Sequence, residues 1–548
     1  MSDQFVEVTT ENGILRGKKL QSTGLTSVPY YAFLGVPYAK PPIGDLRFKA
    51  PQPLEPWQGV RDALEDGLSA PQTLFAPGQV QGVEDCLYLN VYTPQHPHQV
   101  KSLKPVLFNV HGGGYVGGSG GSKAYPPDNF IDKDVVYVSP TYRVGALGFL
   151  SLQNDDISGN AGLKDQVQAL IWTKKNIKKF GGDPENITIM GISGGSASVE
   201  YLLLSQLATG LFKKAICQSG SSLGMWAMDE DPKGTAIELA KAMGYTGSSE
   251  DDKSLYEFFK SCPANDFVLK QNEVFNDRAK NLYRFGFAPC VEKEGKGSKF
   301  ITRTPRDILE NGDFTKVPVI IGYTSREGFI VLMAPMVNDY NLLDKNRQIF
   351  IPKNLKVPEN KRTEVGNEIV KLYFGDKPVS KESINSLVDL FGDMLFNVGI
   401  SEATKYLSEK SDKPVYNYIF TKKRPKSTMI NLIAAMNPGE DQVLGLEGVP
   451  HGGDSEFMYK TAMPNFPPPA EYESDEVPFV KACTTLISTF GKTGNPNCAE
   501  IGFRWIPFSS SNPQYFNWGD EFKMVPGRFC EKRLKFWEEL YKKYGYVF

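Results

Sequence analysis

The segment NITIMGISGGSAS, residues 186–198, contains a serine in the pattern Gly-x-Ser-x-Gly. This pattern is typical of a sharp strand-to-helix turn that exposes a catalytic serine. The segment Gly117–Gly121 matches the same pattern around Ser119, so the pattern alone does not identify a nucleophile. A β-rich run precedes Ser193 and a helical pattern follows it, whereas two prolines follow Ser119. We therefore predict that Ser193 is a nucleophile. The alternative is a serine that only caps a helix.

A serine hydroxyl needs a general base, which is usually a histidine. The chain has only four histidines. His96 and His98 lie in a proline-flanked stretch that reads as an exposed loop, and His111 begins a glycine-rich segment. Enzymes that carry a serine on such a turn place the histidine last in chain order. The sequence therefore predicts that His451 is the base. The alternative is a histidine in a surface loop.

A run of glycines begins directly after His111, at the end of a β-rich run at 105–110. The backbone N–H groups of such a loop can stabilise an oxyanion, and glycine lacks the Cβ that would block a substrate carbonyl. We predict that the N–H groups of Gly113, Gly114 and Gly194 are the donors. The alternative is a phosphate-binding loop, but this segment lacks the Gly-Lys-Ser/Thr ending of such loops.

A third group must orient His451 and stabilise its cation. Acidic residues are numerous between Ser193 and His451, so the residue types alone leave the choice open. Glu327 is the best-placed candidate, because it lies in a turn just past a strand-like run at 316–322. Asp313 lies on the N-terminal side of that run and suits the role less well.

Strands and helices that must position these groups alternate along the chain. Strand-like runs occur at 105–110, 134–140, 186–190, 316–322 and 413–420, and helical patterns occur at 163–180, 194–207 and 530–545. Strands that alternate with helices predict an α/β fold with a large, mostly parallel twisted sheet and helices on both faces. Two stretches rich in helical pattern, 225–310 and 330–412, are expected to be excursions over the active-site end that form upper pocket walls. No flexible linker separates them, so we expect one domain over residues 1–548.

The composition excludes several classes of function. The chain has 548 residues, a hydrophobic share of 41% and a net charge of −2, so neither nucleic acid nor an acidic membrane surface is favoured as a partner. A membrane-spanning helix needs about 18 consecutive apolar residues, and no apolar run in the sequence is that long. Seven scattered cysteines favour neither a disulfide framework nor a zinc site, and we expect no metal and no cofactor. We expect a cytoplasmic protein. The alternative is a secreted protein that has lost its signal peptide.

With these residues in place, the chain resembles the type-B carboxylesterases, the cholinesterase-like branch of the α/β-hydrolases, and within it the insect alpha-esterases. The resemblance covers nearly the full length. The motifs that carry it are YYAFLGVPYAKPPIGDLRFKAP (30–51), EDCLYLNVYTP (84–94), HGGGYVGG (111–118), YRVGALGFLS (142–151), GNAGLKDQ (159–166), FGGDPENITIMG (180–191) and KTGNPN (492–497).

The resemblance implies roles for particular residues. It makes Glu327 the third member of the triad and places Ser219 close to that triad. It implies that Trp226 belongs to the pocket for the acyl group. It also implies two structural ion pairs, Arg47–Glu84 and Arg143–Asp165.

The chain departs from the family pattern at several positions. Ile192 stands where a glutamate normally precedes the nucleophile, so we expect less negative potential near His451 and slower turnover. Gly194 replaces the usual alanine and keeps its donor N–H. Cys86 lacks its usual cysteine partner, and the segment 74–86 lacks the tryptophan that binds quaternary ammonium groups, which argues against choline esters.

The resemblance implies a serine carboxylesterase for neutral, apolar esters, which acts through an acyl-enzyme on Ser193. Organophosphates and carbamates are the expected inhibitors, and xenobiotic, pheromone or hormone esters are the expected substrates. One alternative is a slow esterase that mainly sequesters apolar ligands or organophosphates. Another is a non-catalytic adhesion protein. The sequence predicts neither the physiological ester nor the oligomeric state.

Overall fold

The computed structural model describes residues 4–73, 78–275, 285–333, 339–436, 445–462 and 471–547. Within these residues, thirteen strands form a single sheet. The strands are β1 (Phe5–Thr9), β2 (Ile14–Gln21), β3 (Pro29–Pro37), β4 (Val60–Asp62), β5 (Tyr88–Thr93), β6 (Lys104–Val110), β7 (Val136–Pro140), β8 (Gly182–Ile192), β9 (Lys214–Gln218), β10 (Val319–Thr324), β11 (Val415–Phe420), β12 (Gln514–Trp518) and β13 (Lys523–Pro526).

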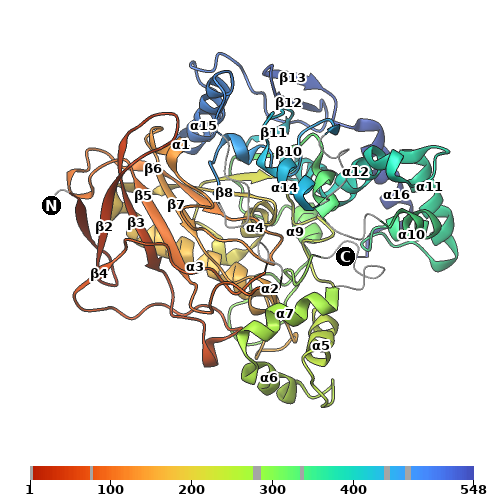
Figure 1. Cartoon of the computed structure of the whole chain (residues 1–548), viewed down its shortest axis with the longest axis horizontal. Helices are drawn as coiled ribbons and strands as arrows, with labels where there is room; N and C mark the ends of the chain where they lie inside the picture. Colours follow the sequence, from red (N-terminus) through yellow and green to blue (C-terminus); the bar gives the residue numbers. More distant parts are fainter. Residues whose placement is uncertain are drawn as a thin grey trace.

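The helices connect the strands and cover the sheet (Figure 1). They are α1 (Asp128–Ile131), α2 (Gly145–Phe149), α3 (Ala161–Asn176), α4 (Gly194–Leu204), α5 (Pro232–Ala242), α6 (Asp252–Ser261), α7 (Ala264–Phe275), α9 (Pro305–Asn311), α10 (Tyr340–Lys345), α11 (Arg362–Phe374), α12 (Ile384–Gly392), α13 (Val398–Glu409), α14 (Thr428–Met436), α15 (Glu476–Thr493) and α16 (Glu531–Tyr544).

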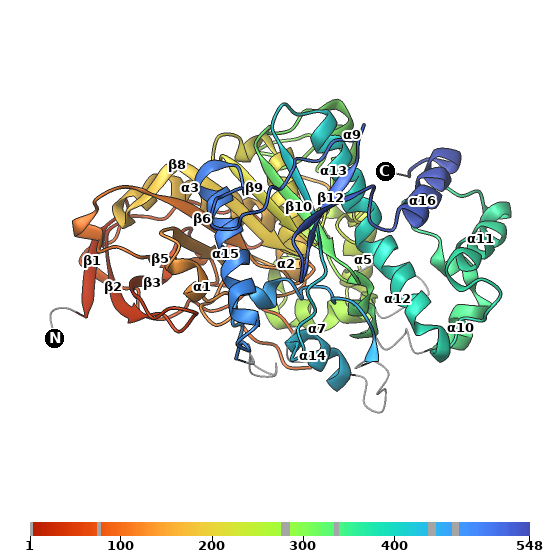
Figure 2. The same ribbon diagram turned by 90° about the horizontal axis from the view of Figure 1, so that it is seen from above.

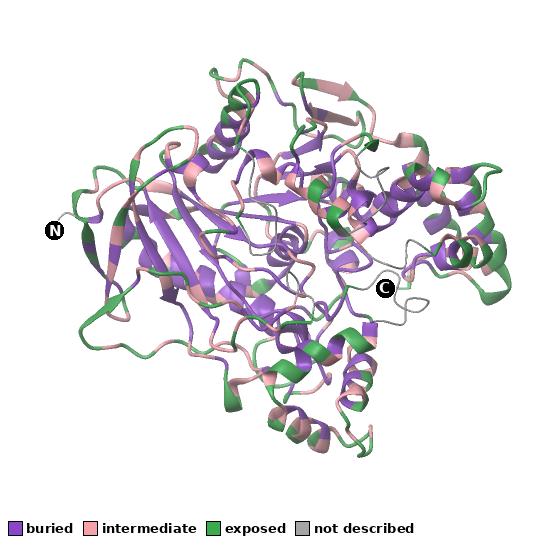
Figure 3. Cartoon of the chain, viewed as in Figure 1, coloured by how far each residue is buried: buried purple, intermediate pink, exposed green. Residues whose placement is uncertain are grey.

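The sheet is parallel at its centre, and the strand pairs at both ends are antiparallel except for β2 with β4. Its order is β1-β2-β3-β5-β7-β6-β8-β9-β10-β11-β12-β13, with β4 paired to β2. From β7 to β12 all neighbouring strands run parallel. Figure 3 shows that these central strands are almost wholly buried, as the continuous apolar runs of the sequence predict.

Two apolar clusters pack on opposite faces of the sheet. Successive strand side chains point to opposite faces, and on β6 the buried residues Val106 and Phe108 join one cluster while Leu107 joins the other. Residues of α3 and α4 belong to the first cluster, and residues of α15 belong to the second. The expected mostly parallel sheet with helices on both faces is therefore confirmed.

Several predicted elements are present with shifted ends. The helical pattern at 163–180 forms α3 and a 3₁₀ turn, which ends at Gly181 with a φ of 83°. The strand expected at 186–190 begins earlier, at Gly182, because Gly182 pairs with Lys104 at the start of β6. The long-range pairing of β6 with β8 therefore decides where the strand starts.

The two expected excursions contain helices. Helices α5, α6 and α7 fall within 225–310, α9 begins there and ends one residue beyond it, and α10 to α13 fall within 330–412. In Figures 1 and 2, helices α10, α11, α12 and α16 gather at the end of the molecule opposite the N-terminus. Parts of both excursions, 276–284 and 334–338, lie outside the described residues. Their role as pocket walls and the single-domain boundary at 1–548 stay predictions. No described helix is long and apolar enough to cross a membrane.

Candidate active site

Ser193 is the single residue between the end of β8 and the start of α4. Its backbone has φ 58° and ψ −124°, a conformation that residues with a Cβ rarely adopt. The turn is held by two backbone hydrogen bonds, in which the Ser193 N–H donates to the carbonyl oxygen of Gln218 at 2.8 Å and the Ala197 N–H donates to that of Ser193 at 3.0 Å. Ile192 and Gly194 are buried, whereas Ser193 stays partly exposed. The sharp turn predicted around this serine is therefore present.

Glycines let the turn pack closely against its neighbours. A Cβ at Gly195 would lie 2.1 Å from the carbonyl oxygen of Val110, and a Cβ at Gly191 would lie 2.5 Å from that of Gly195. Atoms cannot approach so closely, so the first turn of α4 can pack on β6 and β8 only without these side chains. The glycines of the motif are therefore required for this close packing.

His451 is hydrogen-bonded to the predicted acid. Its Nδ1–H donates to Oε2 of Glu327 at 2.5 Å. The other oxygen of Glu327, Oε1, accepts from Oγ of Ser219 at 2.6 Å and from the backbone N–H of Thr324 at 2.6 Å. Glu327 is fully buried, and these donors stabilise its charge and fix its position. The structure therefore brings Glu327, His451 and Ser219 together.

The loops that carry the acid and the histidine are tied to each other. The N–H of Arg326 donates to the carbonyl oxygen of Val449 at 3.0 Å, and the N–H of Val449 donates to Oγ of Ser325 at 3.0 Å. Arg326 and Pro450 also form a parallel β-bridge. This pairing aligns the backbone before His451 with the backbone before the acid.

The second ring nitrogen of His451 is free. Nε2 is buried and has no hydrogen-bond partner among the described residues. This nitrogen is the one that a general base presents to a serine hydroxyl. Next to the histidine, a Cβ at Gly452 would lie 4.0 Å from Cδ1 of Ile192, so the histidine loop passes beside the residue that precedes Ser193.

The predicted oxyanion loop lies against the Ser193 turn. Gly113 and Gly114 have φ values of 116° and 57°, which favour glycine. A Cβ at Gly112 would lie 3.3 Å from the Ser193 Cβ, and a Cβ at Gly194 would lie 2.9 Å from the Gly114 nitrogen. The three predicted donors therefore belong to two backbone segments in close contact.

His111 is part of the scaffold of this loop. Its ring stacks on Tyr142 with a centroid distance of 4.1 Å, and the Tyr142 hydroxyl donates to the carbonyl oxygen of His111 at 2.9 Å. Nδ1 contacts the carbonyl oxygen of Gly112 at 2.8 Å. Burial lowers the pKa of His111 to about 4. A neutral, packed ring supports the choice of His451 over His111 as the base.

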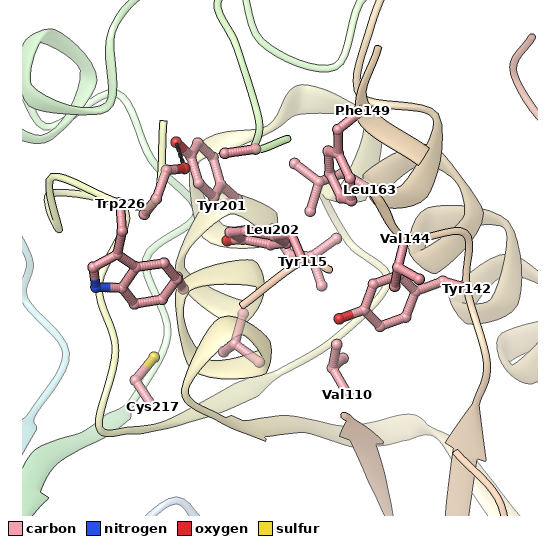
Figure 4. Packing of buried hydrophobic residues seen from close by; sticks show 14 of the residues in the cluster. Val110, Tyr115, Tyr142, Val144, Phe149, Leu163, Tyr201, Leu202, Cys217 and Trp226 are labelled. Carbon is pink, nitrogen blue, oxygen red and sulfur yellow. Dashed lines mark hydrogen bonds between the residues drawn. The ribbon is translucent and has the colours of Figure 1, made fainter. Parts of the chain in front are cut away.

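An apolar wall connects Trp226 to the histidine. The Trp226 indole N–H donates to the carbonyl oxygen of Leu395 at 2.8 Å, and its ring lies 5.8 Å from Phe285 and 5.9 Å from Phe396. The Phe396 ring lies 4.5 Å from that of His451. Figure 4 shows Trp226 within the buried aromatic cluster near α4. The wall carries no charge, so it suits an apolar ligand.

Sequence reasoning did not identify Phe396 or Asp454. Phe396 lies in a π-helical turn, Asp393–Asn397, and no local pattern marks it as a neighbour of the histidine. Asp454 follows the histidine by three residues and accepts from Nε2 of Gln218 at 3.2 Å and from the hydroxyl of Tyr418 at 3.0 Å. Burial raises the pKa of Asp454 to about 6, and the charge of Glu327 adds to the rise. In the sequence, only the position of Asp454 three residues after His451 could have marked it as part of the site.

The two ion pairs that the resemblance implied are confirmed. Arg47 binds both carboxylate oxygens of Glu84, at 2.6 and 2.7 Å. Arg143 and Asp165 are buried, and NH2 of Arg143 lies 2.6 Å from Oδ1 of Asp165. Cys86 is a buried free thiol. Among the described residues, no three His, Cys, Asp or Glu side chains gather as metal ligands would.

Comparison with known proteins identifies the family. Residues 4–537 match the sequence model of the carboxylesterase family. Esterase E4 of Myzus persicae is 35% identical over 492 residues, which cover 88% of this chain and 85% of that protein. Juvenile hormone esterase of Tribolium castaneum is 32% identical over 500 residues, which cover 88% of this chain and 83% of that protein.

A solved structure supports the same assignment. The crystal structure of juvenile hormone esterase from Manduca sexta, with OTFP covalently attached, superposes with a TM-score of 0.85 at 28% identity. The match covers 98% of this chain and 100% of that one. The expected α/β-hydrolase fold is therefore confirmed. This chain belongs to the carboxylesterase family and is a carboxylic ester hydrolase.

Proposed function

We propose that the chain hydrolyses neutral, apolar carboxylic esters through an acyl-enzyme on Ser193. The observation that carries this proposal is the hydrogen bond from Nδ1 of His451 to Glu327, which leaves Nε2 without a partner among the described residues. The carboxylate fixes the tautomer in which Nε2 can accept a proton. Ser193 adds a partly exposed hydroxyl on a strained turn beside the glycine loop.

In the first step, Oγ of Ser193 attacks the ester carbonyl and its proton passes to Nε2 of His451. The N–H groups of Gly113, Gly114 and Gly194 bind the negative charge that forms on the carbonyl oxygen. The C–O bond to the alcohol then breaks, and the alcohol leaves with the proton from His451. The acyl group remains on Ser193.

In the second step, water attacks the acyl group while His451 takes its proton. Collapse of this intermediate returns the proton to Oγ of Ser193 and releases the carboxylic acid. Glu327 accepts the hydrogen bond from Nδ1 of His451 and stabilises the imidazolium in both steps.

The wall of Trp226, Phe285 and Phe396 supports a preference for apolar acyl groups. We also propose that the substrates include xenobiotic, pheromone or hormone esters, and similarity to juvenile hormone esterases supports the hormone esters. Organophosphates and carbamates should react covalently at Ser193. The covalent attachment of OTFP to the Manduca sexta protein supports this expectation.

A second candidate function is sequestration by a slow esterase. Ile192 favours it, because this buried apolar residue lies beside the histidine loop where it adds no negative charge to stabilise the imidazolium. Such a protein would acylate Ser193 and release the acid slowly.

We propose that the chain works in a reducing compartment such as the cytoplasm. All seven of its cysteines are free thiols, which supports this location. Secretion is the alternative. Fractionation of cells that express the tagged chain would distinguish the two.

Labelling with a fluorophosphonate, followed by peptide mass spectrometry, tests the proposed function. We expect one adduct, on the peptide that contains Ser193, and loss of p-nitrophenyl butyrate hydrolysis in proportion to labelling. Ser193→Ala should give neither adduct nor hydrolysis. An adduct on another residue, with activity retained in Ser193→Ala, would overturn the proposal.

A further inference from the structure

Glu200 is a buried carboxyl group that the proposed mechanism does not use. It lies on α4, seven residues and therefore about 10 Å along the helix axis from Ser193. Its exposed fraction is 0%. No described lysine, arginine or histidine forms an ion pair with it. An uncompensated carboxyl group in this position is costly and needs a structural or functional reason.

One oxygen of Glu200 collects several hydrogen bonds. Oε1 accepts from Oγ of Ser221 at 3.0 Å, from the backbone N–H of Ser222 at 3.1 Å, and from Oγ of Ser222. Oε2 is also buried and has no hydrogen-bond partner among the described residues. The carboxyl group therefore holds two successive serines in place.

These serines belong to the segment 218–226, which contacts several parts of the candidate site. Gln218 accepts the N–H of Ser193, and Ser219 donates to Glu327. Ser219 has a positive φ of 59°, so its backbone must be held in place by its surroundings. Trp226 ends the segment in the apolar wall. A shift of this segment would reach the nucleophile, the acid and the wall together.

We propose that Glu200 is a positioning residue for ester hydrolysis: through Ser221 and Ser222 it holds the segment 218–226 in register with Ser193 and Glu327. The inference rests on the proposed function of Ser193. It assigns no contact between Glu200 and the substrate. Two turns of α4 connect the carboxyl group to the nucleophile, and the serine segment connects it to the acid.

The strength of the hydrogen bonds from Ser221 and Ser222 to Glu200 should depend on pH. Burial raises the pKa of Glu200 to about 7, although the bonds from Ser222 and Ser221 oppose the rise. The titratable groups near it are Tyr201 on α4, Cys217 on β9 and Tyr115 after β6, and burial raises the pKa of each, so all stay neutral. Glu200 therefore changes its own charge near neutrality. Its ionised form accepts charge-assisted hydrogen bonds, which are the stronger ones.

The test compares pH profiles of kcat/KM for wild type and Glu200→Gln with p-nitrophenyl butyrate. Glutamine has the same shape and can accept from the serines, but it cannot ionise. Wild type should show two ionisations on its acidic side, and we assign the second to Glu200. Glu200→Gln should show only the first, with kcat/KM lowered roughly fivefold above about pH 8 and little changed below about pH 6.

Two further variants sharpen the test. Ser222→Ala removes one donor to the carboxylate, so the second ionisation should move to higher pH. Glu456→Gln is the matched control, because the pKa of the partly buried Glu456 is also raised to about 7, yet its partners are Ser427 and Met429. It should keep the second ionisation.

Two results would overturn the proposal. One is a second ionisation that persists unchanged in Glu200→Gln. The other is a loss of kcat/KM in Glu200→Gln that is equal at all pH values, which would indicate a purely structural role. Failure of the proposed function is distinguishable, because wild type itself would then show no turnover that depends on Ser193.

Discussion

Gly194 and Gly114 come so close that a Cβ on Gly194 would lie 2.9 Å from the nitrogen of Gly114. Both residues carry N–H groups that we assign to the oxyanion site. Their backbones belong to different segments, the start of α4 and the loop after β6. In this chain the two sets of donors therefore lie closer together than the alanine that is usual at position 194 would allow.

Gly194→Ala should consequently impair catalysis more than folding. The new Cβ must push the glycine loop away by a few tenths of an ångström or more, and misplaced donors lose part of their stabilisation of the oxyanion. We expect kcat to fall roughly tenfold or more. Gly445→Ala is the control, because a Cβ there meets no described atom within 4 Å. Equal kcat values for Gly194→Ala and wild type would contradict this assignment.

Glu327→Gln should reduce kcat by roughly 10³-fold or more. The glutamine oxygen can still accept from Ser219 and Thr324, so its NH₂ group must face Nδ1 of His451. Two donors then oppose each other, and the ring is driven to the tautomer that cannot accept at Nε2. Steady-state hydrolysis of p-nitrophenyl butyrate measures the effect. A kcat within tenfold of wild type would exclude Glu327 as the orienting acid.

Ile192→Glu should speed turnover and shift its pH dependence. A carboxylate beside the histidine loop favours protonated His451, so the acidic limb of kcat should move to higher pH, by up to about one unit. The same charge stabilises the imidazolium during reaction, so deacylation should be faster at alkaline pH. Ile192→Gln has the same size without the charge and should show neither effect. If both variants behave alike, the charge is irrelevant and the sequestration argument fails.

Asp454 should make the fold less stable as pH rises. Its pKa is raised from 3.8 to about 6 by burial, so the native state binds a proton that the unfolded state has already released in this window. Its contribution to stability is therefore full below about pH 4 and lost as pH rises through about 6. Asp454→Asn lacks this loss and should gain stability relative to wild type across that window, by at most about 3 kcal/mol.

Urea denaturation at about pH 4.5, 6 and 8 measures this difference. The free energy of unfolding of Asp454→Asn minus that of wild type should rise with pH and then level off. A difference that stays constant with pH would show that the pKa of Asp454 is not raised in the native state.

Local sequence patterns predicted the elements around Ser193 well. The glycines that flank this serine are required by close packing against Val110, which is why a short motif indicates the turn. Short β-rich runs bounded by turn residues also predicted the central strands. Strand ends were less predictable, because partners distant in sequence set them, as Lys104 does for Gly182.

The site was predictable only in part. His451 followed from elimination, whereas the residues alone made Glu327 only the best-placed of several acidic candidates and the family resemblance singled it out. Phe396 reaches the histidine from a π-helical turn about 200 residues beyond Ser193, and only tertiary packing places it there. Glu200 did carry a signal, because it is the one charged residue in the helix 194–204.

The most direct test of the central claim is the pre-steady-state hydrolysis of p-nitrophenyl butyrate by wild type and Ser193→Ala. We predict that wild type releases p-nitrophenol in a burst that matches the enzyme concentration and then continues at a steady rate. Ser193→Ala, folded by circular dichroism, should show neither phase. A burst without later turnover would favour sequestration over hydrolysis. Undiminished turnover in Ser193→Ala would contradict the assignment of Ser193 as the nucleophile.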